Sequence, residues 1–428
     1  MLTDQNSATT AAAPGATGAT GADPGASRAY ASPFANKSGG SASSDTERPY
    51  PTPAMALDAI DPFNVKRVLE RVGRVRDEIA SAADLGFLMN ARRALFPLPL
   101  VDRAEPVPAD VLPPFTGRPA PGLKDKRVAI VGSGGSGACV TLVGVARAFE
   151  EANVRPAAIS ACSGSAVWGA MWAAGMTADE MADFSLAWRP QDYLDIQWTR
   201  IPRFALSASR GFTGLAKGEA LERLFDRRLW HMSAGETDVP IHTTVYNLDR
   251  GRLEQFGSET TPDLTLGELV RIAVALPVAV EAVRVEGDLY VDGGVIDAFP
   301  TEPLVEDGGF DHVFGLNVLL PPGLQGDAID GVDARRMSLI DLSRRIAAGG
   351  HLELARRNLR RLGEAVTLIE PVEPGETRGA AFYDLFLDRR RWPELMRRGH
   401  EAALDALEPF RAKPRAAAGR PAGARSRA

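Results

Sequence analysis

Three short stretches of the sequence carry residue types that together could hydrolyse an ester: a serine among small residues, a glycine-rich loop, and an aspartate before two glycines. The serine is Ser163, which follows an apolar, strand-like run and precedes a helix-like run. At a sharp strand-to-helix turn a serine hydroxyl projects from the backbone, and the helix N-terminus offers N–H groups to a developing oxyanion. The pattern predicts a nucleophile, with a buried turn as the alternative.

The residues around Ser163 are small, as a tight elbow requires. Ala161 and Ser165 stand two positions before and two after it, where the G-x-S-x-G pattern has glycines, and Gly164 follows it directly. Small side chains at these positions let a strand and a helix pass close together. We therefore expect both substitutions to be tolerated.

The glycine-rich loop is GSGGSG, which includes Gly132, Gly134, Gly135, Ser136 and Gly137. It fits G-x-G-x-x-G, so a dinucleotide-binding enzyme is one alternative. That fold needs an acidic residue about twenty positions further on, to bind ribose hydroxyls. No Asp or Glu occurs at 157–162. The loop is better explained as an oxyanion hole, or as a tight turn without function.

A serine nucleophile needs a base. Asp292 ends an apolar run and precedes Gly293 and Gly294, although an aspartate before two glycines is also a common turn. Among five histidines, His312, His351 and His400 follow in the order that an α/β-hydrolase triad would allow. They lie at a strand start or in arginine-rich helical stretches. Asp292 is the favoured base.

The order of apolar runs predicts an α/β fold, a three-layer α/β/α sandwich around a mostly parallel sheet. Strand-like and helix-like runs alternate from residue 126, and such alternation gives parallel strands with right-handed crossovers. We expect the core at 126–320, with a helical extension at 321–410 packed on it. Helical additions are expected at both ends.

The flanks differ in composition from this core. Residues 1–60 are rich in Ala, Gly, Ser, Thr and Pro and predict a disordered arm. Residues 61–125 predict a helix, at 64–95, and then a proline-rich connector. Residues 411–428 predict a basic disordered tail, with contact to anionic lipid as the alternative.

The composition argues against several classes of protein. A net charge of −6 and no interleaved basic and aromatic residues argue against a nucleic-acid partner. Two cysteines, Cys139 and Cys162, make no disulfide framework or zinc motif, so we expect no metal and no cofactor. No signal peptide is visible, which favours a cytoplasmic protein. The charge-free stretch 156–178 could span a bilayer, yet its serines and glycines favour a buried strand, turn and helix.

In this order and spacing the three motifs resemble the patatin-like phospholipase family over residues 126–320. The loop resembles the family's G-G-G-x-R/K-G signature, with Ala138 at the basic position and Gly144 six residues later. Cys162-Ser163-Gly164-Ser165 is similar to the elbow of the cytosolic phospholipase A2 branch. Asp292-Gly293-Gly294 resembles the family's D-G-G/A segment.

The resemblance implies a Ser163–Asp292 dyad without histidine, an acyl-enzyme, and an oxyanion hole from the N–H groups of Gly134, Gly135 and Ser136. It implies a lipid ester substrate, either a phospholipid, a lysophospholipid or an acylglycerol, and brief contact with a membrane surface. Ser136 replaces a glycine, and Ala138 removes a cation that could bind phosphate. A catalytically weak or inactive lipid-binding protein of the same fold is therefore an alternative.

The chain also gathers aromatic residues between 171 and 215. These are Trp172, Trp188, Tyr193, Trp198 and Phe204. They favour a buried core over a membrane-contacting surface. The sequence leaves open the lipid headgroup, the acyl position, any activator and the oligomeric state.

Overall fold

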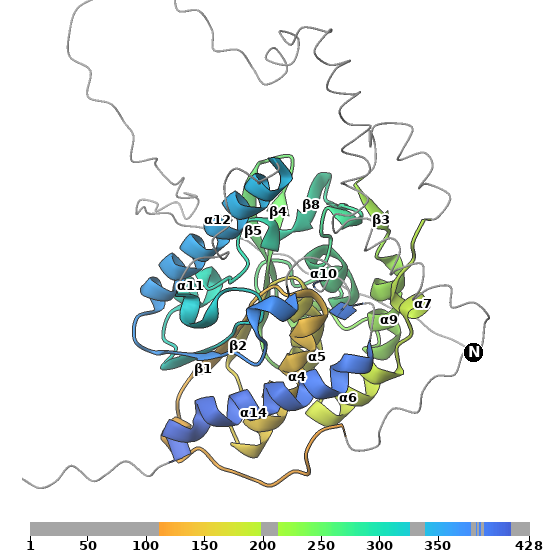
Figure 1. The fold of residues 1–428 in the computed structure, drawn as a ribbon. Helices are drawn as coiled ribbons and strands as arrows, with labels where there is room; N and C mark the ends of the chain where they lie inside the picture. The colour runs from red at the N-terminus through yellow and green to blue at the C-terminus, as the bar shows by residue number, and fades with distance from the viewer. Residues whose placement is uncertain are drawn as a thin grey trace, which may run out of the picture. The chain divides into compact units, whose positions relative to one another are not determined.

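The computed structural model describes residues 111–197, 213–325, 339–377, 382, 385–386 and 389–411. The predicted arm at 1–60, the predicted helix at 64–95 and the tail at 412–428 lie outside these residues, as do Trp198 and Phe204. Within them, helices cover both faces of a mostly parallel central sheet (Figure 1), which confirms the three-layer α/β/α prediction.

The central sheet has eight strands in the described part of the chain, in the order β10-β9-β1-β2-β4-β8-β7, with β5 paired to β4. The strands are β1 (Val128–Gly132), β2 (Ala158–Ala161), β4 (Ile241–Asn247), β5 (Arg252–Gly257), β7 (Val283–Val285), β8 (Asp288–Asp292), β9 (His312–Leu316) and β10 (Val366–Ile369). Strands β10, β9, β1, β2 and β4 are parallel, whereas β5 and β8 run antiparallel to β4. Since β10 pairs with β9, the sheet extends past residue 320.

The two faces of the sheet are covered by different helices. The helices are α4 (Thr141–Glu151), α5 (Gly164–Ala173), α6 (Ala178–Ala187), α7 (Pro190–Tyr193), α9 (Glu219–Arg228), α10 (Leu266–Ala273), α11 (Glu302–Asp307), α12 (Leu339–Leu362) and α14 (Trp392–Arg411). Val128 and Ile130 pack with residues of α4, α5 and α14, while Ala129 and Val131 pack with residues of α11 and α12. This alternation follows from the two-residue repeat of a strand, and a strand buried on both faces must be apolar throughout.

Two short strands and two 3-10 turns also bear on the position of the site. A second, two-stranded parallel sheet joins β3 (Gly214–Ala216) to β6 (Val278–Val280). Two 3-10 turns, η2 (Ser136–Val140) and η5 (Gly293–Val295), follow the ends of β1 and β8.

Strands β2 and β8 meet end to end beside β4. Ala161 pairs with Thr243 and Asp292 pairs with Val245, while β5 occupies the whole opposite edge of β4. Because β2 is parallel and β8 antiparallel to β4, their C-terminal ends converge two residues apart. The sheet thereby brings the segment after β2 toward the last residue of β8.

The charge-free stretch 156–178 folds as predicted for a buried segment. It contains β2 and the buried helix α5. No helix among the described residues is long and apolar enough to cross a membrane. The aromatic side chains of Trp172, Trp188 and Tyr193 are buried, as predicted for a core cluster.

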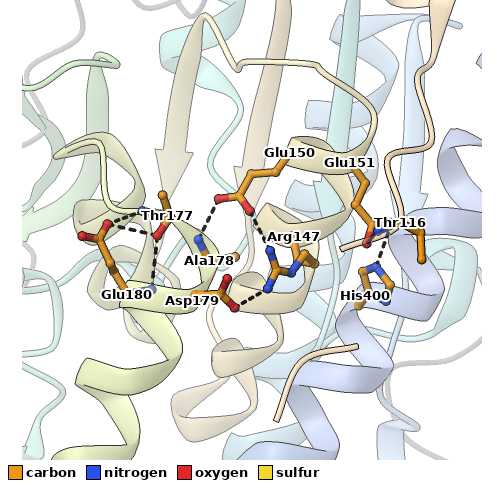
Figure 2. A network of polar contacts seen from close by, with 9 residues as sticks. All are labelled: Thr116, Arg147, Glu150, Glu151, Thr177, Ala178, Asp179, Glu180 and His400. Carbon is orange, nitrogen blue, oxygen red and sulfur yellow. Dashed lines mark hydrogen bonds and ion pairs between the residues drawn. The ribbon is translucent and has the colours of Figure 1, made fainter. Parts of the chain in front are cut away.

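A polar network links α4 to its neighbours (Figure 2). The Arg147 guanidinium pairs with Asp179 of α6 and with Glu150. The buried Glu151 carboxylate accepts from the Thr116 hydroxyl at 3.2 Å and lies 3.4 Å from His400 Nε2 of α14. Burial lowers the pKa of His400. The network joins the C-terminal end of α4 to the N-terminal end of α6, to the middle of α14 and to the segment before β1.

Helices α4 and α14 cross at two glycines. A Cβ on Gly144 would overlap the Met396 carbonyl oxygen, and a Cβ on Gly399 would overlap the Thr141 carbonyl oxygen. Absence of both side chains lets the two backbones touch, so the helices pack more closely than side chains normally permit.

We predict that Gly144→Ala destabilises the fold by at least about 2 kcal/mol, because the methyl group would overpack the helix crossing. Gly350→Ala is the matched control. A Cβ there meets nothing within 4 Å inside α12, so it should stabilise by about 0.5–1 kcal/mol. Urea unfolding measures both. Equal stability of the two variants would contradict the tight crossing.

Candidate active site

Ser163 lies in the junction between β2 and α5, where the sequence indicated a strand-to-helix turn. It is the N-cap of α5, with φ 52° and ψ −123°. A non-glycine residue at positive φ is strained by about 1–3 kcal/mol. Such strain is the geometry of a nucleophile elbow, in which the serine side chain projects from the turn. Ser163 itself is half-buried.

The small residues around Ser163 pack closely against β1, and the Ser165 hydroxyl also forms a hydrogen bond. A Cβ on Gly132 would lie 2.6 Å from the Ser165 Cβ, so β1 can carry only glycine there. The Ser165 hydroxyl donates to the Ser133 carbonyl at 2.5 Å. A serine in place of the elbow glycine therefore ties the elbow to the glycine loop.

Asp292 ends β8 and lies beside the elbow. Its Oδ1 accepts the Gly294 N–H at 2.8 Å and lies 3.9 Å from the Cys162 Sγ. The carboxyl is 1% exposed, and this burial raises its pKa to about 6, although hydrogen bonds from Ser163, Gly294 and Cys162 act in the opposite direction. A Cβ on Gly293 would overlap the Thr244 carbonyl, so glycine is required for this approach to β4.

The three histidines that a Ser-His-Asp triad could have used contact residues other than Ser163 and Asp292. His312 bonds the Thr367 hydroxyl at 2.9 Å, His351 bonds the Val295 carbonyl oxygen at 3.0 Å, and His400 pairs with Glu151. The residue that the sequence reasoning missed is Cys162. It directly precedes Ser163, and its thiol lies 3.9 Å from the Asp292 carboxylate.

The glycine loop lies against the nucleophile. A Cβ on Gly134 would stand 3.7 Å from the Ser163 Cβ, and a Cβ on Gly164 would overlap the Ser136 carbonyl oxygen. The Gly134 N–H donates to the Ala298 carbonyl at 2.9 Å. Within the described part of the chain, the N–H groups of Gly135 and Ser136 have no protein acceptor. These two groups are the better candidate donors to an oxyanion.

The two departures in the loop differ in consequence. Ser136 has φ 54°, in the left-handed region that favours glycine, so this substitution is strained. Ala138 is fully buried within η2. Gly137 packs where a Cβ would overlap the Leu385 carbonyl oxygen. The loop is thus enclosed by the segment before α14.

An apolar cavity of ≈ 70 Å³ opens beside Ser163. Side chains of Tyr193, Leu221, Val274, Leu276, Val280 and Phe386 contribute to its lining. The Tyr193 hydroxyl donates to the Phe386 carbonyl at 2.6 Å, which joins two walls that are far apart in sequence. A cavity of this character suits a hydrocarbon chain. Its lining comes from separate parts of the chain, so no local sequence pattern indicates it.

The fold is a three-layer α/β/α sandwich in which an elbow serine lies near a buried aspartate. Residues 130–305 match the family model described as patatin-like phospholipase. The chain therefore contains, over these residues, a domain that matches the patatin-like phospholipase family. This match covers the glycine loop, which leaves the dinucleotide alternative without support.

Solved structures similar to this chain include two bacterial proteins and one human protein. VipD from Legionella pneumophila is 12% identical, with 67% of each chain covered and a TM-score of 0.40. The type III effector ExoU, from Pseudomonas aeruginosa, is 15% identical, with 69% of this chain and 54% of that chain covered and a TM-score of 0.37. Human GIVD cytosolic phospholipase A2 is 10% identical, with 78% and 64% covered and a TM-score of 0.34.

The raised pKa of Asp292 predicts opposite effects on activity and stability. As the predicted base, Asp292 would have to be ionised, so kcat/KM should fall as the pH drops through about 6. The raised pKa means that the folded state binds the proton more tightly than the unfolded state. Above pH 6 the buried charge therefore lowers the free energy of unfolding. The free energy of unfolding rises again as the pH falls from about 6 to 3.8, where the folded state takes up the proton first.

Asp292→Asn should then be inactive and more stable at pH 8, by up to about 3 kcal/mol for a two-unit shift. The gain should shrink as the pH falls from 6 toward 4. Thermal unfolding across this range measures it, and a destabilised Asn variant at pH 8 would contradict the assignment.

Ser136 offers a separate test of the loop. Ser136→Gly should relieve positive-φ strain and leave stability unchanged or raised by about 1 kcal/mol, whereas Ser136→Val should lower it by more than about 1 kcal/mol. Since the backbone N–H is the proposed donor, the glycine variant should keep kcat. Loss of kcat in Ser136→Gly would show that the hydroxyl, rather than the N–H, acts in catalysis.

Proposed function

We propose that this protein hydrolyses lipid esters through a Ser163–Asp292 dyad. The observation that carries the proposal is a strained elbow serine beside a fully buried carboxylate, whose pKa burial raises and the Ser163 side chain partly lowers. A carboxylate of raised pKa is a stronger base than an exposed one and can take a serine proton at neutral pH. The patatin-like domain supports lipid hydrolase activity.

In the proposed reaction, Asp292 accepts the Ser163 proton as Oγ attacks the ester carbonyl carbon. The carbonyl oxygen becomes an oxyanion, which the N–H groups of Gly135 and Ser136 stabilise, with Gly134 holding the loop. The C–O bond to the alcohol breaks, and the proton passes from Asp292 to the leaving alkoxide. Asp292 next deprotonates water, which attacks the acyl-enzyme, releases the fatty acid and restores Ser163.

The apolar cavity beside Ser163 would hold the acyl chain, with the ester at its mouth. A lipid in a membrane would have to present its ester to this mouth, so we infer brief contact with a membrane surface. Phospholipids, lysophospholipids and acylglycerols all offer such an ester. A fully buried alanine at position 138 supplies no cation for a phosphate.

The dyad is tested with a short-chain p-nitrophenyl ester. Ser163→Ala and Asp292→Asn should each lose at least about 10³-fold in kcat/KM, because the nucleophile or its base is gone. Asp183→Asn, an exposed carboxylate on α6, is the matched control and should keep full activity. If Ser163→Ala kept more than a tenth of wild-type activity, the proposed dyad would be wrong.

The strained Ser136 favours a second candidate, a lipid-binding protein of this fold with little or no catalysis. A folded wild-type protein that binds vesicles, yet cleaves neither the p-nitrophenyl ester nor vesicle lipid, would support this candidate over the hydrolase.

A further inference from the structure

Helix α12 holds the segment that follows the candidate base. The helix begins at Leu339, beyond the 130–305 match. Its Asn358 side-chain amide donates to Asp297 Oδ2 and to the Phe299 carbonyl oxygen, both at 3.1 Å. About two turns earlier in the helix, His351 bonds the Val295 carbonyl oxygen at 3.0 Å. Three contacts from one helix therefore fix residues 295–299.

The same segment supports the glycine loop. The Ala298 carbonyl oxygen accepts the Gly134 N–H at 2.9 Å. Ala298 lies between Asp297 and Phe299, the two residues that Asn358 holds, and Asp297 Oδ1 accepts the Phe299 N–H at 3.0 Å. Movement of this short turn would therefore move the carbonyl on which Gly134 rests.

The contacts are buried, so losing them is costly. Asn358 is 3% exposed and Asp297 is 5% exposed. Burial raises the pKa of Asp297, while its hydrogen bonds from Phe299 and Asn358 favour the charged form. Leaving a buried acceptor without its donor costs far more free energy than leaving an exposed one unpaired. We therefore expect the turn to shift until its polar groups are hydrogen-bonded again.

We propose that Asn358 is a positioning residue for catalysis, which sets the oxyanion loop through Ala298 and Gly134. The inference rests on the proposed hydrolase function. Asn358 touches no reacting atom. It holds the turn that connects the base at position 292 to the loop that receives the oxyanion. An error of about 1 Å in such a loop can cost a hundredfold in rate.

The test compares Asn358→Leu, which keeps the volume and removes the donors, with Asn358→Ala, in which water can bridge. Active sites are counted by complete reaction with a fluorophosphonate probe and mass spectrometry of the labelled Ser163. We expect kcat per labelled site on the soluble ester to fall 10- to 100-fold, with KM within about threefold. Arg357→Ala, on the exposed face of α12, is the control and should match wild type.

A purely structural role would lower the labelled fraction and leave kcat per labelled site unchanged, and this result would overturn the inference. In a double variant that combines Asn358→Leu with Asp297→Ala, kcat per labelled site should fall about as far as in Asp297→Ala alone, because both residues act through one turn. Fully multiplicative losses would also overturn it.

If Asn358→Leu does not fold, Asn358→Ala is judged by the same readout. An inactive wild type, or an active Ser163→Ala, would instead overturn the proposed function and this inference with it.

Discussion

The candidate site depends on the way in which two strands share one edge of β4. Strand β2 ends at Ala161 and strand β8 ends at Asp292, and the two ends face each other beside Thr243 and Val245. The chain leaves β2 through the elbow, so Ser163 emerges where the carboxylate is already held. A hydrogen-bonded ladder fixes this separation more firmly than two loops could, and the chemistry requires that firmness.

This arrangement buries a charge, and the surrounding residues offset part of its cost. Desolvation raises the pKa of Asp292, while the Gly294 N–H and the Cys162 thiol lie against its oxygen. The elbow adds backbone strain at Ser163. Both the buried carboxylate and the backbone strain lower the stability of the fold, as is common at catalytic centres.

Elements after residue 305, outside the match to the patatin-like family model, help to enclose the candidate site. Helix α14 crosses α4 at paired glycines, and the backbone of Leu385 covers the glycine loop at Gly137. Phe386 contributes a wall of the apolar cavity and accepts a hydrogen bond from Tyr193. The site is therefore enclosed by elements that the catalytic motifs do not reveal.

The sequence alone determined the alternation of strands and helices, the elbow at Ser163 and the aspartate before two glycines, because each depends on residues that are adjacent in the chain. Local patterns carry such information directly. Three features became visible only in the folded chain: Asp292 lies beside the elbow, the Gly134 N–H is bonded to Ala298, and Ser136 takes a left-handed conformation. Those outcomes follow from the pairing of strands and the packing of segments more than a hundred residues apart, which no local pattern encodes.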